Sequence, residues 1–254
     1  MEFGKNKRLN NILRHKDSNL IIVPLDHGFT LGPISGIENI GETIKKLSQY
    51  NINAFILHKG IIRSYSNELL ETDIPIIMHL SASTYLNPVN NYKVNIGSVE
   101  EAISLGCDAV SIQINLGSEH ESEMIYEAGI ISEKCYQYGM PLLAMMYARG
   151  KNINNETDVE TIKMVTRVGA EIGADLIKTC FCGRSKEFQN VVVGCPVPII
   201  VAGGEKCKNE EEFLNNMKIA MSCGVRGVGV GRNIFQSNNL DFIMKELNQI
   251  VHGK

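Results

Sequence analysis

The sequence lacks the features that mark proteins which bind nucleic acid, span a membrane or depend on disulfides. Its formal net charge is −3, and its longest basic run is the short KNKR at residues 5–8, which argues against nucleic acid as a partner. No stretch approaches the ~18 uninterrupted apolar residues of a membrane helix, and the N-terminus is charged and polar. We therefore expect a cytoplasmic protein with neither a nucleic-acid partner nor a membrane partner.

The cysteines and the connecting segments also lack any distinctive pattern. Seven cysteines, an odd number, scatter through apolar segments without a Cys-x-x-Cys pair, so they predict no disulfide framework. Cys180 and Cys182 have a spacing that suits metal or redox chemistry, but residues i and i+2 of a strand also share one face, and we favour packing. No Pro/Gly/Ser-rich linker divides the chain, which predicts one domain over 1–254 with a short N-terminal extension over 1–19.

Short apolar, β-branched runs do recur along the chain and alternate with longer amphipathic ones. The short runs predict strands of a parallel sheet that is buried on both faces. They span residues 20–27, 53–59, 74–80, 108–115, 141–147, 174–180, 197–202 and 227–231. The amphipathic stretches predict helices over residues 36–50, 99–106, 119–138, 158–173, 209–224 and 240–252. Gly106, Gly139, Gly173 and Gly224 stand where four of these helices should end.

Eight strands that alternate with helices over about 250 residues match the strand count and size of a (β/α)8 barrel. The competing architecture is an open, doubly wound sheet. The number eight and the position of the polar residues favour an α/β, single-domain (β/α)8 TIM barrel.

Polar and glycine residues gather at the carboxyl ends of the predicted strands, where the active site of a barrel lies. The opposite strand ends are almost wholly apolar or small. The residues at the carboxyl ends are Asp26, His27, His58, Lys59, His79, Asn115, Tyr147, Arg149, Lys178, Gly203, Gly204, Gly231 and Arg232.

Two glycine-containing loops predict a phosphate site. Gly203-Gly204 follows the seventh strand and Gly231-Arg232 follows the eighth, and these loops are the usual phosphate site of the barrel. Glycines let backbone N–H groups approach phosphate oxygens, and an arginine adds a bidentate contact. A dinucleotide fold is disfavoured because no G-x-G-x-x-G opens a helix after the first strand.

Lys178 stands near the end of the apolar run ADLIKTC, where a strand core has no use for a cation. An apolar barrel mouth disfavours the ammonium form, and the neutral amine can attack a ketone to form a Schiff base, an electron sink for carbon–carbon bond chemistry. The alternative is a structural lysine that reaches the rim or pairs with Asp26.

Tyr147 and Asp26 are candidates for the proton transfers that a Schiff-base enzyme requires. Tyr147 ends the strand next to that of Lys178, and Asp26 ends the first strand. Their structural alternatives are a hydrogen bond at the rim for Tyr147 and a helix N-cap for Asp26.

A rival hypothesis involves His27, His58 and His79. These histidines end three consecutive strands and could hold a zinc ion that polarises a carbonyl. That hypothesis gives no role to Lys178, and we predict no metal and no cofactor.

Six motifs resemble the archaeal-type class I aldolase family over nearly the whole chain and in the same order. They are VPLDHGFTLGPI, LHKGI, PLLAMMYARG, LIKT, IVAGG and GVGVGRNIFQ. The resemblance implies a (β/α)8 barrel in a ring-like homo-oligomer, a decamer. It also implies that Lys178 forms the Schiff base, Tyr147 donates a proton and Asp26 acts as acid and base. The substrate contacts that it implies are Asp26, His27, Gly28, Phe29, Thr30, Tyr147, Ala148, Arg149, Gly203, Gly204, Gly231 and Arg232.

Within this family the motifs are most similar to transaldolase-like synthases of aromatic amino-acid biosynthesis. The resemblance implies phosphorylated sugar and aldehyde substrates, with L-aspartate 4-semialdehyde condensed with a three-carbon unit. Alternatives are a class I fructose-bisphosphate aldolase, an aldol joining of the same semialdehyde with dihydroxyacetone phosphate, and a sugar-phosphate-binding sensor without activity. The sequence departs from the family pattern at two places: Ala148 stands where the synthases have a proline, and the stretch TCFCGRSKEF contains two cysteines. Both places lie beside the predicted substrate pocket, so they bear on the identity of the substrate more than on the mechanism.

Overall fold

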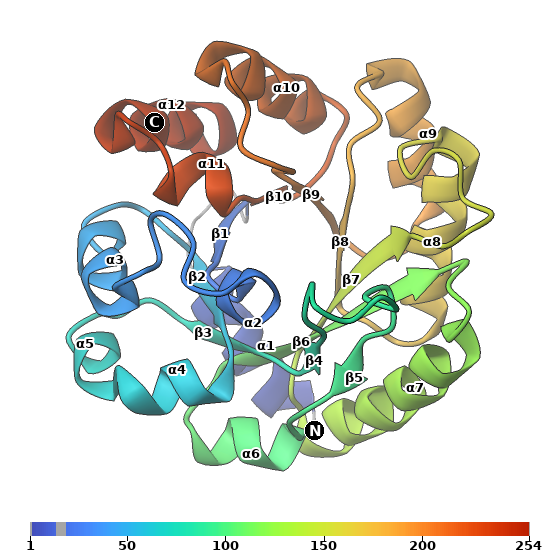
Figure 1. The fold of residues 1–254 in the computed structure, drawn as a ribbon, viewed down its shortest axis with the longest axis horizontal. Helices are drawn as coiled ribbons and strands as arrows, with labels where there is room; N and C mark the ends of the chain where they lie inside the picture. The colour runs from blue at the N-terminus through green and yellow to red at the C-terminus, as the bar shows by residue number, and fades with distance from the viewer. Residues whose placement is uncertain (1, 14–18, 254) are drawn as a thin grey trace.

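The chain closes into a barrel of eight parallel strands (Figure 1). A computed structural model describes residues 2–13 and 19–253. Strand β1 pairs with β10 on one side and with β2 on the other, which closes the ring, so the predicted TIM barrel is confirmed. In barrel order the strands are β1 (Leu20–Pro24), β10 (Gly227–Gly229), β9 (Ile199–Ala202), β8 (Leu176–Thr179), β7 (Leu142–Ala148), β6 (Ala109–Leu116), β3 (Ile76–His79) and β2 (Ala54–Leu57).

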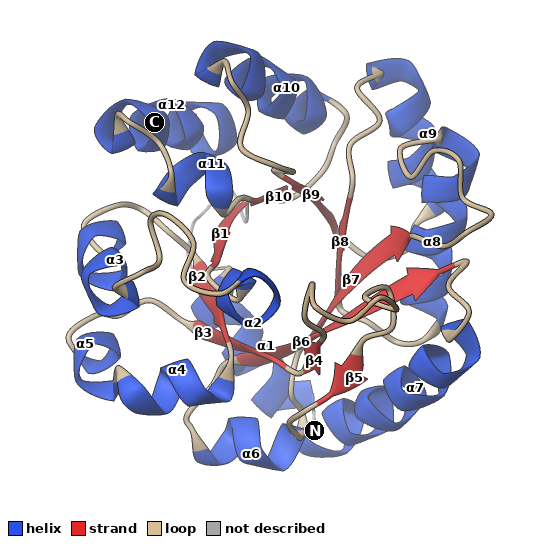
Figure 2. Cartoon of the chain, in the orientation of Figure 1, coloured by secondary structure: helices blue, strands red, loops and turns tan. Residues whose placement is uncertain are grey.

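Helices surround the barrel, as Figure 2 shows, and six of them lie within the predicted helical ranges. They are α3 (Ile40–Leu47), α6 (Val99–Ser104), α7 (Glu121–Tyr138), α8 (Val159–Glu171), α10 (Glu210–Ser222) and α12 (Leu240–His252). Sequence patterns did not predict α1 (Glu2–Ile12), α2 (His27–Leu31), α4 (Lys59–Ser64), α5 (Ser66–Leu70), α9 (Ser185–Gly194) and α11 (Arg232–Phe235).

Local signals fix the helix ends. The Asp158 carboxylate caps α8 by accepting a hydrogen bond from the backbone N–H of Thr161 at 3.1 Å, and Asn209 caps α10 in the same way. Gly139 ends α7 in the left-handed conformation, at φ 60° and ψ 39°, which a residue with a Cβ adopts less readily.

The barrel strands bury both of their faces, because one face fills the barrel and the other packs under the helices. The interior cluster takes alternate residues of several strands, such as Leu20 and Ile22 of β1 and Leu143, Met145 and Tyr147 of β7. The remaining apolar residues of the strands pack with the helices in a larger cluster. This two-sided burial explains why the strands appear as continuous apolar runs.

Helix α1 closes the amino-terminal end of the barrel, behind the strands in Figure 1. Ile12 joins the interior cluster, and Lys5 forms a salt bridge of 2.9 Å with Asp175, which precedes β8. The buried Asn53 amide donates to the carbonyl of Ile12 at 2.8 Å. The first part of the predicted extension over 1–19 is therefore a plug for the barrel; residues 14–18 lie outside the described part of the chain.

Five of the eight strands (β1, β2, β3, β8 and β10) end earlier than predicted, and one hairpin was not predicted. Strand β1 stops at Pro24, so that Asp26 and His27 lie in the turn and in α2 rather than in the ladder. The antiparallel pair β4 (Ser81–Ala82) and β5 (Val94–Asn95) follows β3 outside the barrel order. Both differences arise where polar side chains leave the barrel to form its rim.

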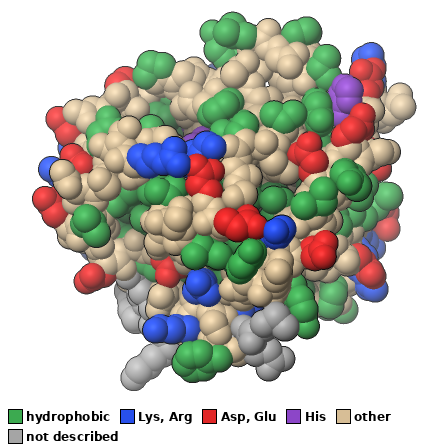
Figure 3. Space-filling model, turned by 90° about the horizontal axis from the view of Figure 1, so that it is seen from below, with side chains coloured by type: hydrophobic (Ala, Val, Ile, Leu, Met, Phe, Trp, Pro, Cys, Tyr) green, Lys and Arg blue, Asp and Glu red, His purple; other side chains and the backbone are tan. Residues whose placement is uncertain are grey.

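The outer surface mixes charges of both signs. On the face seen in Figure 3, Lys and Arg side chains are interspersed with Asp and Glu. All seven cysteines are free thiols. In the described ranges, no helix is long and apolar enough to cross a membrane.

Candidate active site

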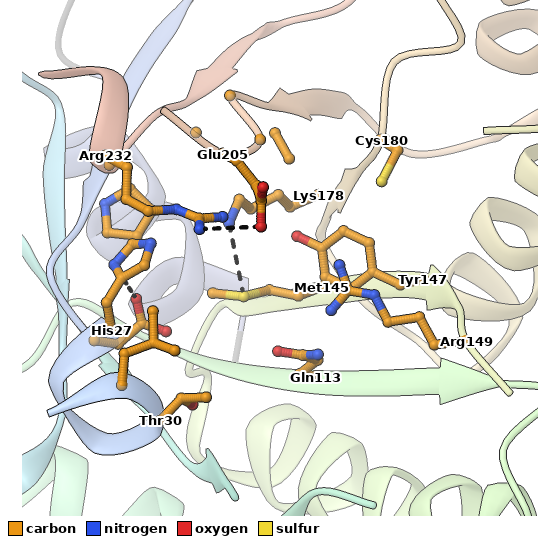
Figure 4. A pocket seen from close by; sticks show the side chains of 18 of the residues that line it. His27, Thr30, Gln113, Met145, Tyr147, Arg149, Lys178, Cys180, Glu205 and Arg232 are labelled. Atoms are coloured by element: carbon orange, nitrogen blue, oxygen red, sulfur yellow. Dashed lines mark hydrogen bonds and ion pairs between the residues drawn. The ribbon is translucent and has the colours of Figure 1, made fainter. Parts of the chain in front are cut away.

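A cavity of about 590 Å³ opens at the carboxyl ends of the strands (Figure 4). Most of the barrel strands contribute to it through the residues at or just after their ends. Its lining consists of Pro24, Asp26, His27, Thr30, Leu31, Asn90, Asn91, Lys93, Gln113, Met145, Tyr147, Arg149, Glu156, Lys178, Cys180, Ala202, Gly203, Gly204, Glu205, Gly229, Gly231 and Arg232.

Lys178 extends from β8 into this cavity. The register sets it beside Met145 of β7 and Ile200 of β9, and only 8% of the residue is exposed. Its only hydrogen-bond contact in the described chain is weak, with Nζ 3.9 Å from the Sδ of Met145. A Cβ on Gly229 would lie 2.8 Å from the Cε of Lys178, so the glycine leaves room for the lysine stem. The amine is therefore free of carboxylate partners and faces the cavity.

Tyr147 lies on the interior face of β7, and Arg149 comes directly after that strand. Tyr147 is buried, and Figure 4 shows its hydroxyl directed toward the part of the cavity where Lys178 lies. The Arg149 guanidinium lies over the Tyr147 ring, 4.4 Å from its centroid, and its Nε donates to Glu156 at 2.8 Å. This stacking fixes the tyrosine ring at the cavity wall.

Asp26 lies among histidines and near Lys178. Its Oδ1 is 3.7 Å from the Nδ1 of His27, and its Oδ2 is 3.7 Å from the Nε2 of His79. Burial raises the pKa of Asp26, but attraction to His79, His27, Lys178 and His58 outweighs burial and lowers the pKa to about 2. Asp26 is therefore ionised at neutral pH and can accept a proton.

Three histidines form a wall behind Asp26, and two of them, His58 and His79, are hydrogen-bonded. The Nδ1 of His79 lies 2.8 Å from the Ser111 hydroxyl, and the Nδ1–H of His58 donates to the His79 carbonyl at 3.1 Å. Burial lowers the pKa of His79 to about 3, and it also lowers the pKa values of His27 and His58. Within the described ranges, no group of three or more His, Cys, Asp or Glu side chains is arranged to hold a metal ion.

The glycine loops form the wall opposite Arg149. Gly203 and Gly204 follow β9, while Gly231 and Arg232 follow β10. A Cβ on Gly231 would lie 2.5 Å from a ring carbon of His27, so only glycine fits between the loop and α2. Arg232 forms an ion pair of 3.5 Å with the exposed Glu205, and its buried Nε has no hydrogen-bond partner among the described residues. An unpartnered guanidinium N–H at a cavity wall suits an anionic ligand.

Sequence comparisons identify relatives over almost the full length of the chain. A profile of the DeoC/LacD family aldolases matches residues 20–237. The 2-amino-3,7-dideoxy-D-threo-hept-6-ulosonate synthase 1 of Archaeoglobus fulgidus is 44% identical over 98% of this chain and 92% of its own. The 2-amino-4,5-dihydroxy-6-oxo-7-(phosphonooxy)heptanoate synthase of Streptomyces griseus is 36% identical over 99% of this chain and 91% of its own. The chain belongs to the DeoC/LacD aldolase family.

Solved structures agree with this assignment. An archaeal fructose 1,6-bisphosphate aldolase superposes with a TM-score of 0.89 at 31% identity, covering 97% of this chain and 100% of its own. Another structure of an archaeal enzyme of that name, with its catalytic lysine covalently bound to the carbinolamine intermediate, has the same TM-score at 30% identity and the same coverage. The predicted resemblance to class I aldolases, and with it the prediction of an enzyme, is confirmed.

In this DeoC/LacD aldolase most of the predicted site residues meet at the cavity. They are Asp26, His27, Thr30, Tyr147, Arg149, Lys178, Gly203, Gly204, Gly231 and Arg232. Gly28, Phe29 and Ala148 do not line it: Phe29 packs against His58 with ring centroids 5.0 Å apart, and Ala148 points to the helix side of β7. Lys59 also lies outside the lining, where it pairs with Glu101 at 3.1 Å.

Sequence reasoning missed six polar lining residues: Asn90, Asn91, Lys93, Gln113, Glu156 and Glu205. Gln113 shares the interior face of β6 with Asn115, and its position two residues before that strand end could have revealed it. Lys93 precedes β5 and Glu156 lies in the loop before α8, so neither has a strand-end signal. Only the folded chain brings them to the barrel mouth.

Proposed function

We propose that the DeoC/LacD aldolase described here forms a Schiff base through Lys178 and joins a three-carbon ketone unit to L-aspartate 4-semialdehyde. The observation that carries the proposal is a buried amine that forms no ion pair with the described residues and faces a cavity that Tyr147 and Asp26 also line. A lysine of a related barrel, 30% identical, has been captured in a carbinolamine with its substrate. The same chemistry at Lys178 explains why a cation stands in an apolar strand.

The names of the two relatives define the substrate by simple disconnection. Both products are seven-carbon chains with a 2-amino acid at one end and a ketone at C6. An aldol bond lies between the α carbon of the ketone and the carbinol carbon, here C5 and C4. Cleavage there leaves C1 to C4 as the four-carbon amino-acid aldehyde L-aspartate 4-semialdehyde, and C5 to C7 as a three-carbon ketone. The two relatives differ in whether C7 carries a phosphate.

In the proposed reaction, the Lys178 amine attacks the ketone carbon of a phosphorylated keto-sugar. Loss of water, with Asp26 moving protons to and from the carbinolamine oxygen, gives the iminium. Asp26 takes the β-hydroxyl proton as the carbon–carbon bond breaks, which releases an aldehyde and leaves an enamine on Lys178. The enamine carbon attacks the aldehyde carbon of the semialdehyde, the carbonyl oxygen takes a proton from Tyr147, and the proton held by Asp26 restores Tyr147. Water hydrolyses the new iminium and restores the lysine.

The wall formed by Gly203, Gly204, Gly231 and Arg232 is the proposed site for the phosphate of the keto-sugar. Arg232 offers an unpartnered guanidinium N–H, and glycines allow close approach of the backbone. Loops after these two strands are the usual phosphate site of the fold.

Trapping of the imine tests the proposal directly. The protein is incubated with dihydroxyacetone phosphate, fructose 1,6-bisphosphate or a deoxyketo-sugar phosphate, reduced with borohydride and mapped by mass spectrometry. We expect an adduct on Lys178. Lys178→Ala should abolish it and lower turnover by at least about 10³-fold.

Lys59→Ala is the matched control, because Lys59 is another lysine of the barrel rim but pairs with Glu101 outside the cavity. Full residual turnover of Lys178→Ala would overturn the mechanism. Tight binding of the phosphorylated ligands without any adduct would favour a sugar-phosphate sensor. Turnover of fructose 1,6-bisphosphate that aspartate semialdehyde does not affect would favour a fructose-bisphosphate aldolase.

We further propose that the enzyme works in the cytoplasm as a ring-like homo-oligomer, a decamer. Phosphorylated sugars and zwitterionic aldehydes do not diffuse across membranes, so an enzyme that uses both needs the compartment that makes them. Large apolar side chains remain exposed on the neighbouring outer helices α7, α8 and α9, as a contact between copies requires.

A further inference from the structure

On the side of the cavity away from Arg232 lies a second set of polar side chains, which has no role in the proposed reaction steps. Lys93 enters the cavity from the segment that joins β4 to β5, and its Nζ donates to the Ser83 hydroxyl. Among the described residues no carboxylate forms an ion pair with it. Burial, followed by repulsion from Arg149, lowers the pKa of Lys93 to about 8. A cation that is half-buried without an anion is costly, and an anionic ligand would offset that cost.

Ser83 ties this segment to the rest of the cavity mouth. Its hydroxyl donates to the Asn90 carbonyl at 2.8 Å, and its own carbonyl accepts from the Thr30 hydroxyl of α2 at 3.0 Å. The hydrogen bonds hold Lys93 in place before any ligand enters, which reduces the entropy that binding must overcome.

Arg149 and Glu156 complete the group. Glu156 accepts from the Arg149 Nε at 2.8 Å, and both side chains line the cavity. Burial, followed by the Glu156 charge, raises the pKa of Cys180, which stands two residues after Lys178 and lines the same cavity. Two cations and one carboxylate therefore surround the same part of the cavity.

This group is separate from the glycine loops. Arg232 follows β10 and Arg149 follows β7, and the barrel order β10–β9–β8–β7 places the Lys178 strand between them. Figure 4 shows Arg232 and His27 at one side of the cavity, Tyr147 and Arg149 at the other, and Lys178 between. A substrate bound to Lys178 can thus extend toward two different polar ends.

We propose that Lys93, Arg149 and Glu156 form the acceptor subsite and recognise the amino-acid end of the aldehyde. Lys93 and Arg149 bind the α-carboxylate, and Glu156 binds the α-ammonium. The inference rests on the proposed function, because it names the residues that select the aldehyde which the Lys178 enamine attacks.

The presence of Glu156 favours a zwitterion over a phosphate at this end. Two cations alone would suit either anion. A carboxylate beside them repels a phosphate dianion but attracts an ammonium group, so it selects against phosphorylated aldehydes. The three charges together match the α-carbon of an amino acid.

The subsite is tested with two analogues of the aldehyde acceptor, each of which lacks one of its two charged groups. With dihydroxyacetone phosphate as the donor, KM is measured for L-aspartate 4-semialdehyde, succinic semialdehyde, which lacks the ammonium, and 3-aminopropanal, which lacks the carboxylate. Lys93→Met should raise KM about tenfold or more for the two carboxylated acceptors and leave 3-aminopropanal unchanged. Glu156→Gln should raise KM for the two ammonium-bearing acceptors and leave succinic semialdehyde unchanged.

The controls are Lys151→Met and Glu119→Gln, which break an exposed lysine–glutamate pair outside the cavity. They should leave every KM unchanged. If Lys93→Met folds poorly, Lys93→Arg keeps the charge and should retain a KM within a few-fold of the parent.

Binding of L-homoserine, a non-reacting alcohol analogue of the semialdehyde, separates this inference from the proposed function. Calorimetry should detect its binding to the parent protein and its loss in Glu156→Gln. Imine trapping on Lys178 together with parental KM values in both cavity variants would overturn the subsite and leave the mechanism intact. A preference of the parent protein for glyceraldehyde 3-phosphate as acceptor would also overturn the subsite. If no imine is trapped on Lys178, the Schiff-base mechanism is wrong, and the binding of homoserine still tests the subsite.

Discussion

At the scale of single residues, the wall behind Asp26 combines burial with neutral histidines. His79 is buried, touches the Ser111 hydroxyl and faces the Asp26 carboxylate. Burial lowers its pKa from the ordinary 6.5 to about 3, so the folded protein keeps this ring neutral where the unfolded chain protonates it. Between these two values the unfolded state binds more protons, and the stability of the fold must fall as the pH falls.

We predict that His79 makes the free energy of unfolding decrease by up to about 1.4 kcal/mol per pH unit as the pH falls from 6.5 toward 3. Asp26 adds a loss in the same direction only at lower pH, as its carboxylate protonates between its ordinary pKa of 3.8 and about 2. Urea unfolding between pH 7 and pH 4 measures the slope. His79→Gln should flatten it, whereas the exposed His120→Gln should not. Equal slopes in both variants would refute the assignment.

At the scale of elements, the parts of the fold that could be predicted are those with a recognisable hydrophobic pattern in the sequence. The eight strands are continuous apolar runs because both faces are buried, and α8 or α12 shows the amphipathic pattern that a helix on a barrel needs. Asp26, Tyr147 and Lys178 could be predicted as site residues because they stand at the carboxyl ends of predicted strands, and the barrel topology brings those ends together. The short helices α4, α5 and α11 have too few turns for such a pattern.

The β4–β5 hairpin could not be predicted because long-range contacts hold it in place. Asn95 donates from its backbone N–H and its side chain to Glu127 of α7, at 3.1 and 2.8 Å, and the segment before it bonds to α2 through Ser83. The sequence STYLNPVNNYK between the two strands has neither a period of two nor a helical period. No sequence pattern therefore marks Lys93 as a residue of the cavity.

Helix α1 allows a prediction at this scale, because it closes the barrel at the end opposite the cavity. The buried Asn53 accepts from the backbone N–H of Ile21 and donates to the carbonyl of Ile12, both at 2.8 Å. Asn53→Ala should leave both groups unpaired and lower the free energy of unfolding by about 1–3 kcal/mol. Imine trapping at Lys178 should persist. Asn11→Ala, which removes an exposed bond to Asp108, is the control and should cost less. An equal loss in both variants would contradict this role of Asn53.

At the scale of the whole molecule, the cavity and the proposed assembly surface involve different residues. The exposed apolar side chains of the outer helices α7, α8 and α9 do not line the cavity. Tyr126 and Ile130, 71% and 43% exposed, stand one turn apart on α7, and Met164 of α8 and Val193 of α9 are also exposed. Figure 1 shows these helices in succession around one side of the barrel. Water-exposed apolar area of this kind favours a contact with another copy.

We therefore predict that Ile130→Glu lowers the particle mass measured by light scattering after size-exclusion chromatography, because a charge in an apolar contact must be desolvated. Leu70→Glu is the control, since Leu70 is an exposed apolar residue of α5, away from these helices. The smaller particles should still form the Lys178 adduct, because Ile130 does not line the cavity. An unchanged mass for Ile130→Glu would place the contact between copies elsewhere. Loss of the adduct in a folded, smaller particle would mean that the neighbouring copy holds the cavity in shape.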